Sequence, residues 1–402
     1  MARLPTGWRF EKIGNLCEVG RGPSPRPINN TAYFEGGTIP WIKIADATKS
    51  GKYLYETKEH VNEFGASFSR LLPKGSLILA ASGTLGYTQI LGIDGCIHDG
   101  WLYLTNFKDV EKDFLYYLFL YQKQFFYNSA YGAAIQNINT MILRDMEIAL
   151  PPLPSQRKIA EVLSAYDDLI ENNSRRINIL EHLAQSVYLE WCGKVDDKSL
   201  PRGWEATKLK DIAEVNSSSI KKGNEPDEIY YIDIASVSTG SIDKVELLKF
   251  SDAPGRARRI VKHGDIIWSS VRPNRKSYSL IINPISNLIV STGFAVIRAV
   301  SVPFSYLYLT TTTEDFVSYL TSHATGAAYP AVTGSVFEDA VVVLPTKELL
   351  QKFDEIVNPL LIMQQTLFTQ NANLRRTRDL LLPRLVSGEV DVSGIQFADP
   401  EL

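Results

Sequence analysis

Two long stretches of the chain repeat apolar residues at alternating steps of four and three positions. The first runs through Ile159, Leu163, Tyr166, Ile170, Asn173, Ile177, Leu180, Ala184, Val187 and Trp191. The second runs through Phe353, Val357, Leu360, Gln364, Leu367, Asn371, Leu374, Arg378, Leu381 and Leu385. This heptad spacing is typical of helices that pair along a seam, and it predicts one long helix in 151–195 and another in 345–402.

Asn173 and Asn371 are polar positions near the middle of these two seams. If the helices pair antiparallel about their midpoints, the two asparagines face each other, and a buried polar pair would fix the register. Pro359 has no amide hydrogen, which predicts a kink or a restart of the second helix. The alternative is two amphipathic helices that each pack on their own domain. The expected centre of the seam is Ile170, Asn173, Ile177, Leu180, Leu367, Asn371 and Leu374.

Shorter apolar runs outside these helices predict strands and buried helices. β-branched and aromatic residues dominate "IPWIKI", "SLILAA", "WLYLTNF", "DIIWSS" and "FAVIRAV", and Gly, Pro and Asn turns separate the runs. The longer runs that begin at Asp113 and Pro303 predict buried helices. The predicted fold class is therefore α/β (α+β).

The whole pattern occurs twice. "LPTGW" at Leu4 returns as "LPRGW" at Leu200, and "IPWIKIA" at Ile39 matches "IYYIDIA" at Ile229. A shift of about 195 residues relates these and further blocks, which indicates an internal duplication with pseudo-two-fold symmetry. The expected domains are a first globular domain at 1–150, a central spacer helix at 151–195, a second globular domain at 196–344, and a spacer helix with a tail at 345–402.

Composition narrows the class of protein. The 402 residues are 45% hydrophobic and 22% charged with a net charge of −3, as in globular proteins with more than one core. No run approaches the roughly 18 apolar residues of a membrane span. Cys17, Cys96 and Cys192 are odd in number and far apart, which argues against a disulfide framework or a zinc site. A cytoplasmic location fits this cysteine usage.

The sequence lacks the familiar signatures of catalysis. It contains no G-x-x-x-x-G-K-[ST], no G-x-S-x-G and no H-E-x-x-H, and its five histidines are not spaced as metal ligands. We therefore expect no catalytic residue, metal or cofactor in this chain. Two alternatives from other classes are a DNA methyltransferase or nuclease with a divergent site, and a helical scaffold that does not bind DNA.

The local distribution of charge favours contact with nucleic acid, and the alternative is a solvated charged face. Residues 256–276 hold seven Lys or Arg against one Asp. Arg and Asn can recognise base edges while other cations neutralise phosphates. The predicted contacts here are Arg256, Arg258, Arg259, Arg272, Asn274, Arg275 and Lys276. Those in the first half are Arg21, Arg26, Lys43, Lys49, Thr84, Tyr87, Gln89, Gln136 and Asn137, with Lys52 as a further cation near Lys49.

With these blocks assembled, the chain resembles the specificity subunits of type I restriction–modification systems over essentially its whole length. The resemblance rests on "GRGPSPRP", "GTLGYTQILGIDGCI", "GAAIQNINTMILRDMEIALPPLPSQRKIAEVL", "SSVRPNRKS" and "LRRTRDLLLPRLVSGEVDV". "LPPLPSQRKIAEVL" at Leu150 is especially diagnostic, because such subunits carry a similar segment before each spacer helix. The second copy departs from it and has "LPTKELLQKFDEI" at Leu344.

The resemblance implies a non-catalytic subunit with two target-recognition domains, each of which recognises half of a bipartite site in double-stranded DNA. It further implies that two long antiparallel helices form a coiled-coil-like spacer and dock two modification subunits. Those subunits would bring S-adenosylmethionine and methylate adenine N6. Restriction subunits would bring the ATP-driven motor and the nuclease, with Mg²⁺.

Overall fold

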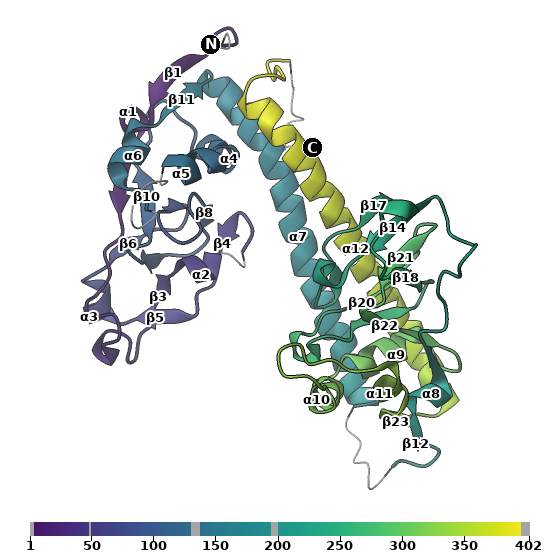
Figure 1. The fold of residues 1–402 in the computed structure, drawn as a ribbon. Helices are drawn as coiled ribbons and strands as arrows, with labels where there is room; N and C mark the ends of the chain where they lie inside the picture. The colour runs from purple at the N-terminus through teal and green to yellow at the C-terminus, as the bar shows by residue number, and fades with distance from the viewer. Residues whose placement is uncertain (1–3, 48–49, 130–136, 194–199, 395–402) are drawn as a thin grey trace. The chain divides into compact units, whose positions relative to one another are not determined.

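Figure 1 shows the computed structural model of the chain, which describes residues 4–47, 50–129, 137–193 and 200–394. The fold is mixed α/β, as the apolar patterns predict. Contacts divide the chain into two units. The first combines Met1–Glu171 with Asn373–Leu402, and the second is Asn172–Ala372.

Two sheets and a strand pair form the globular part of the first unit. In the pair, β1 (Arg9–Lys12) runs antiparallel to β11 (Glu147–Leu150). One sheet has the order β2 (Glu18–Arg21), β10 (Trp101–Thr105), β7 (Leu77–Ala80), β8 (Thr88–Leu91) and β4 (Tyr53–Leu54). The other has the order β5 (Glu59–Val61), β3 (Ile39–Ile42), β9 (Gly95–Ile97) and β6 (Arg70–Leu72).

The position of strand β7 between two hydrophobic cores explains why its sequence is continuously apolar instead of alternating. Leu77 and Leu79 belong to one hydrophobic core, whereas Ile78 and Ala80 belong to another. Successive side chains of a strand point to opposite faces, so a strand with a core on each side needs apolar residues at every position. β7 therefore joins two of the hydrophobic cores of this unit.

The second unit has the same kinds of element. β12 (Glu205–Lys208) pairs antiparallel with β23 (Val341–Leu344). One sheet has the order β13 (Ala213–Val215), β22 (Phe294–Ala299), β19 (Ile266–Ser269) and β20 (Tyr278–Leu280). The other has the order β17 (Glu246–Lys249), β14 (Glu228–Ile232), β21 (Leu288–Ser291) and β18 (Ala257–Ile260), and β15 (Val237–Ser238) pairs with β16 (Ser241–Ile242).

Strand order and direction agree between the two units. The order β2-β10-β7-β8 corresponds to β13-β22-β19-β20, and β5-β3-β9-β6 corresponds to β17-β14-β21-β18. β3 pairs parallel with β9 as β14 does with β21, whereas the other pairs of these two sheets are antiparallel. Gly7 and Gly203, in the repeated "LPxGW" motif, both have φ of 82°, a conformation that favours glycine.

Short helices connect the strands of each unit. Those of the first are α1 (Ile13–Leu16), α2 (Ile44–Ala47), α3 (Glu63–Ala66), α4 (Lys112–Tyr121), α5 (Lys123–Ser129), α6 (Thr140–Asp145) and the 3₁₀ turn η1 (Thr31–Tyr33). Those of the second are α8 (Leu209–Ile212), α9 (Phe304–Thr311), α10 (Glu314–Ser322), α11 (Gly334–Glu338) and the 3₁₀ turns η2 (Ile234–Ser236), η3 (Phe250–Asp252) and η4 (Pro273–Arg275).

The predicted helices at Asp113 and Pro303 are each divided into two. In the first unit Gln122 separates α4 from α5. In the second unit Thr313 precedes α10, and its hydroxyl accepts a hydrogen bond from the Phe316 amide at 3.2 Å. A threonine that caps a new helix in this way supplies the acceptor that the first free amides need. The apolar pattern alone does not mark these divisions.

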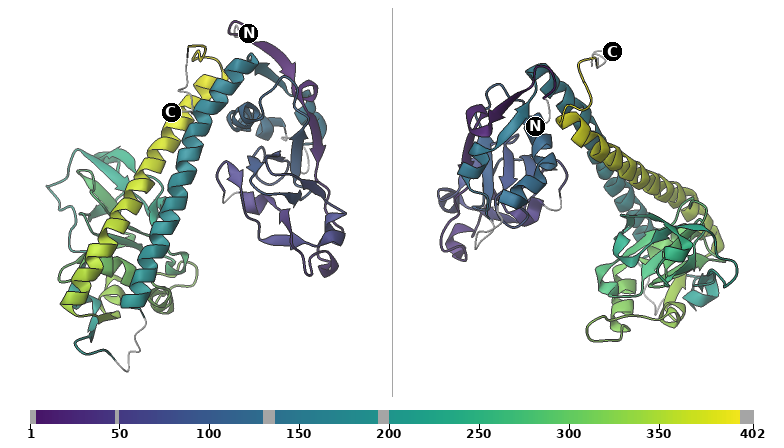
Figure 2. Two further views of the ribbon diagram at one scale, coloured as in Figure 1. Left: turned by 180° about the vertical axis from the view of Figure 1, so that it is seen from behind. Right: turned by 45° about the horizontal axis from the view of Figure 1, so that its top comes forward.

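The two long helices are α7 (Leu153–Trp191) and α12 (Lys347–Val386). Within each unit their segments lie side by side and antiparallel (Figure 2). In the first unit Lys158 Nζ donates to the Ser393 carbonyl at 2.7 Å, and Asp167 forms an ion pair with Arg378. In the second unit the ring of Tyr188 lies 6.3 Å from that of Phe353. Across the described ranges, no helix has the length and apolar character needed to cross a membrane.

The expectation that α12 restarts at Pro359 is wrong, because the helix is continuous from Lys347 to Val386. Pro359 is exposed, so the Glu355 carbonyl that loses its helical partner lies on the side of the helix that water can reach. In α7, Pro154 is the second residue of the helix, where no intrahelical amide bond is needed.

Burial along the helices follows the predicted seam with small displacements. Leu163, Ile177 and Ala184 are buried as expected. Asp167 is buried next to the half-buried Tyr166, and Leu361 is more buried than Leu360. A straight helix has 3.6 residues per turn, so a strict heptad count drifts by about one position over its length.

A buried ion pair lies between the two sheets of the second unit. Asp265 has no exposed surface, and Arg298 on β22 donates to its carboxylate from Nε at 2.8 Å and from Nη2 at 2.6 Å. The Lys262 amide donates to the same carboxylate at 2.6 Å. Removal of one partner of a buried pair leaves the other charge without compensation.

We expect Asp265→Ala to destabilise the second unit by about 3–5 kcal/mol. Glu246→Ala, which removes an exposed ion pair with Lys244, should cost less than about 1 kcal/mol. Hydrogen exchange read by mass spectrometry measures both, with peptides of the first unit as the internal reference. Equal losses of stability in the two variants would contradict the role of Asp265 as the partner of a buried ion pair.

Candidate nucleic-acid interface and helix pair

The turn after strand β19 presents the strongest of the predicted DNA contacts. Arg272 and Lys276 flank η4 with φ of 51° and 54°, and Pro273 between them is buried. Asn274 and Arg275 are exposed. The turn is thus held at its base by Pro273 and directs an amide and a guanidinium toward solvent.

Two cations of this turn are held by neighbouring groups. The Arg272 guanidinium lies 4.6 Å from the ring centre of Tyr329, and its Nη2 donates to the Ala328 carbonyl at 3.0 Å. Stacking of this kind fixes a guanidinium plane without neutralising its charge. Lys276 forms an ion pair with Glu314, which balances its charge.

The arginines near β18 have different surroundings. Arg256 donates to Asp233 from Nε at 2.9 Å and from Nη2 at 2.6 Å, and these hydrogen bonds raise its pKa. Arg258 lies over the ring of Phe250 at 4.9 Å. Burial lowers the pKa of Arg259, whose Nε has no hydrogen-bond partner among the described residues. The predicted one-signed stretch is therefore partly neutralised, while Lys262 and Arg275 remain exposed.

The basic residues of the first unit are engaged as well. Arg21 Nε donates to the Asp99 carbonyl at 2.8 Å, and Arg26 forms an ion pair with the Asp99 carboxylate. Lys43 pairs with Glu59 and lies 4.7 Å from the ring centre of Trp41. All three side chains retain exposed surface. Lys49 and Gln136 lie outside the described residues.

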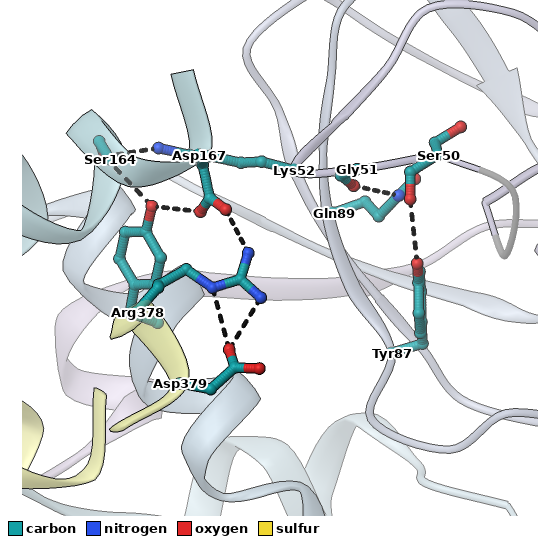
Figure 3. A network of polar contacts seen from close by, with 10 residues as sticks. Ser50, Gly51, Lys52, Tyr87, Gln89, Ser164, Asp167, Arg378 and Asp379 are labelled. Carbon is teal, nitrogen blue, oxygen red and sulfur yellow. Dashed lines mark hydrogen bonds and ion pairs between the residues drawn. The ribbon is translucent and has the colours of Figure 1, made fainter. Parts of the chain in front are cut away.

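The structure corrects the interpretation of Gln89 as a contact to bases. Gln89 is fully buried on β8, and its Nε2 donates to the carbonyls of Ala47 at 3.2 Å and Gly51 at 2.8 Å. Tyr87 is half-buried and its hydroxyl donates to the Ala47 and Ser50 carbonyls, which Figure 3 shows in part. Both side chains thus bind backbone carbonyls at the end of α2 and at residues 50–51.

Thr84 and Asn137 remain candidates of a weaker kind. Both are half-buried, and Asn137 Oδ1 is buried without a hydrogen-bond partner among the described residues. A single half-buried amide is compatible with a contact to a base edge, but it does not identify one.

Lys52 is also corrected, because it is an interior residue with only 5% of its surface exposed. Its Nζ donates to Ser164 Oγ on α7 at 2.7 Å (Figure 3). It also lies 3.7 Å from Asp113 Oδ1 on α4. Burial lowers the pKa of Lys52, and the charge of Asp113 opposes that shift. The ammonium group joins α4 and α7 and cannot meet a phosphate in this position.

Next to Lys52, a carboxylate is buried between the long helices. Tyr117 on α4 donates its hydroxyl to Asp167 Oδ2 at 2.6 Å, and Arg378 on α12 pairs with Asp167 Oδ1. Arg378 also donates to Asp379 Oδ1 at 2.8 Å from Nη2 (Figure 3). Burial and the charge of Asp167 raise the pKa of Tyr117, which therefore stays protonated as the donor. No pattern in the sequence pointed to Asp167, which lies one position off the predicted seam.

The predicted asparagine pair is present in the second unit. Asn173 Nδ2 donates to Asn371 Oδ1 at 3.0 Å, and Asn371 Nδ2 donates to Ser174 Oγ at 3.2 Å. The two asparagines are 8% and 2% exposed. Ile170, Ile177 and Leu367 are buried beside them, whereas Leu180 and Leu374 are half-buried.

Metal ligands do not gather anywhere in the described ranges, where no three His, Cys, Asp or Glu side chains could hold an ion together. Cys17, Cys96 and Cys192 are free and buried. Burial raises the pKa of both Cys17 and Cys192 to about 12, so neither thiol forms a thiolate readily.

The comparisons with known proteins agree with this architecture. Residues 5–182 match the family model of the type I restriction modification DNA specificity domain. The specificity subunit of type I restriction enzyme MjaIX from Methanocaldococcus jannaschii is 26% identical, over 98% of this chain and 95% of the relative. The specificity subunit of type I restriction enzyme MjaVIII from the same organism is 22% identical, over 98% and 96%.

A solved structure shares the fold. The crystal structure of the type I restriction–modification S subunit from M. genitalium superposes with a TM-score of 0.64 at 16% sequence identity, over 95% of this chain and 97% of that chain. This likeness shows a shared fold, and the match to the DNA specificity domain concerns residues 5–182. The resemblance predicted from the sequence is confirmed: residues 5–182 match the family model, and the chain is similar to type I specificity subunits over nearly its whole length.

Proposed function

We propose that this chain is the DNA-recognition subunit of a type I restriction–modification complex and has no catalytic centre of its own. The observation that carries the proposal is the match to specificity subunits over nearly the full length of both chains. Two units with the same strand order support a function in two equivalent halves. Each half would recognise one part of a bipartite site in double-stranded DNA.

The shared strand order also supports an internal duplication. The target-recognition domains would be 1–150 and 196–344, and the spacer segments 151–195 and 345–402. A duplicated chain offers two similar surfaces to two copies of one partner although its two DNA half-sites differ. Modification subunits bound in this way would bring S-adenosylmethionine, and restriction subunits would bring ATP and Mg²⁺, within the cytoplasm.

The η4 turn is the best-supported contact to DNA in the second domain. Arg275 and Asn274 are exposed, and Arg272 is held over Tyr329 with its charge retained. Arg272 is therefore a cation held in place and Arg275 an exposed cation, and both are suited to contact phosphates or base edges. Arg256 and Lys276, which are paired with carboxylates, would contribute less charge.

Charge reversal tests this contact. We expect Arg272→Glu together with Arg275→Glu to weaken DNA binding by the complex at least tenfold, and Arg275→Ala alone to lower the salt slope of binding by about one. Lys244→Glu is the control, because Lys244 is an exposed lysine of the same unit outside the turn. Unchanged DNA binding by an intact complex would favour a scaffold instead.

The helix pair would set the gap between the half-sites. Leu163 packs in one core of the first unit and Tyr188 in one core of the second, so 188 − 163 = 25 residues of α7 separate these two positions. A helix of 25 residues rises about 38 Å. Half-sites one turn apart on B-DNA lie about 34–36 Å from centre to centre. The helix length therefore matches a gap of about one turn.

Matched insertions test the spacer. Four residues added after Arg175 in α7 and four after Thr369 in α12 preserve the pairs on both sides and lengthen the helices by about 6 Å. We expect the tolerated gap to grow by about two base pairs while both half-site sequences stay the same. Methylation mapping measures both properties, and an insertion in α7 alone is the control that loses the pairing. Altered half-site sequences would contradict the spacer role.

Docking of two modification subunits would use the outer faces of the helices. Leu169 on α7 and Met363 on α12 are 51% and 47% exposed. They occupy equivalent positions, because 363 − 169 = 194 is also the shift between the strands β11 and β23. Exposed apolar side chains at equivalent positions of both copies are expected where two identical partners bind.

We expect Leu169→Lys to remove one modification subunit and Met363→Lys to remove the other, with the double variant binding none. Native mass spectrometry of the complex counts the copies directly. Lys substitution at Ile179, another exposed apolar residue of α7, is the control and should leave both copies bound. Loss of both copies in either single variant would contradict two independent docking surfaces.

A further inference from the structure

The seam of the long helices contains polar pairs at two levels. Asp167 pairs with Arg378 in the first unit, and Asn173 pairs with Asn371 in the second. Facing residues of two antiparallel helices have a nearly constant sum of residue numbers. Here 167 + 378 = 545 and 173 + 371 = 544, so both pairs belong to one antiparallel register. In both pairs one partner comes from α7 and the other from α12.

The two copies of the helix differ at these four positions. With the shift of 194 residues, Asp167 corresponds to Leu361 and Arg378 to Ala184. Asn173 corresponds to Leu367, and Asn371 to Ile177. All four corresponding residues are buried and apolar. Each polar residue thus stands where the other copy of the helix has an apolar one.

We propose that these four residues make the helix pairing heterotypic, so that α7 pairs with α12 and rejects the α7 of a second copy of this chain. The same register applied to two α7 helices sets Asp167 against Ala184 and Asn173 against Ile177. Two α12 helices would set Arg378 against Leu361 and Asn371 against Leu367. A pair of two α7 helices or of two α12 helices therefore buries a charge and an amide without their partners, which is unfavourable in a helix seam.

The surroundings of Asp167 strengthen this selection. Tyr117 from α4 donates to one carboxylate oxygen, and Arg378 pairs with the other. The helix α4 thus supplies only part of what the buried carboxylate needs, and α12 supplies the cation. A second copy of α7 offers Ala184 at that level, which has no donor. The internal duplication makes this selection necessary, because two similar helices could otherwise pair with their own kind.

The test uses the full chain and a variant that carries Asp167→Leu, Arg378→Ala, Asn173→Leu and Asn371→Ile. These changes give each position the residue that its counterpart already has, so apolar contacts remain in the intended pair. Native mass spectrometry of a concentration series measures the fraction of two-copy species. We expect the wild-type chain to remain single-copy and the variant to show at least a tenfold larger two-copy fraction.

A spin label distinguishes like pairs from other dimers. In a pair of two α7 helices from two copies of the chain, the numbers of facing residues would add to 544 − 194 = 350, so residue 175 would face residue 175. One label at residue 175 therefore gives a short label–label distance only when two α7 helices meet. We expect that distance in the four-residue variant and not in wild type. An unchanged two-copy fraction, or the same short distance in both proteins, would overturn the proposal.

A milder variant keeps the test decisive if the four-residue variant does not fold. Asn173→Leu with Asn371→Ile retains the Asp167–Arg378 pair, and helix content by circular dichroism checks its fold. We expect a two-copy fraction between those of wild type and the four-residue variant, and a fraction equal to wild type would count against the role of the asparagines. The outcome is independent of the proposed function, whose failure would appear in DNA binding and not in copy number.

Discussion

The buried carboxylate of Asp167 links three helices of the first unit. A charged group away from water is tolerated only when hydrogen bonds and an opposite charge surround it. Tyr117 on α4 and Arg378 on α12 meet that need from two sides. Because Asp167 itself belongs to α7, one ion pair fixes the globular part and both long helices of this unit together.

The two units share strand order but stabilise it with different polar groups. The first unit uses Lys52 against Ser164 and Asp113, whereas the second buries Asp265 against Arg298. A sheet order depends on apolar faces that many sequences can supply, while a buried charge requires particular partners. The common scaffold and the different surface turns are therefore compatible within one chain, as two different half-sites would require.

The sequence predicted the elements that depend on periodicity and missed those that depend on tertiary burial. The heptad spacing identified both long helices and set Asn173 opposite Asn371, because a seam residue is specified by its own helix and its partner. Gln89 and Lys52 have polar side chains in loop or strand segments, and only the folded backbone shows that they are enclosed. The helix does not restart at Pro359, because an exposed proline can be accommodated when the freed carbonyl lies toward water.

The seam and the outer faces of the helices differ in how much the two copies resemble each other. At the seam, Asp167, Asn173, Asn371 and Arg378 each differ in character from their counterparts, whereas the outward-facing Leu169 and Met363 are both large and apolar. Two identical partners, as proposed, would require similar outer surfaces, whereas the proposed selective pairing of α7 with α12 would require unlike seams. One helix can meet both requirements because residues on its opposite faces make no common contacts.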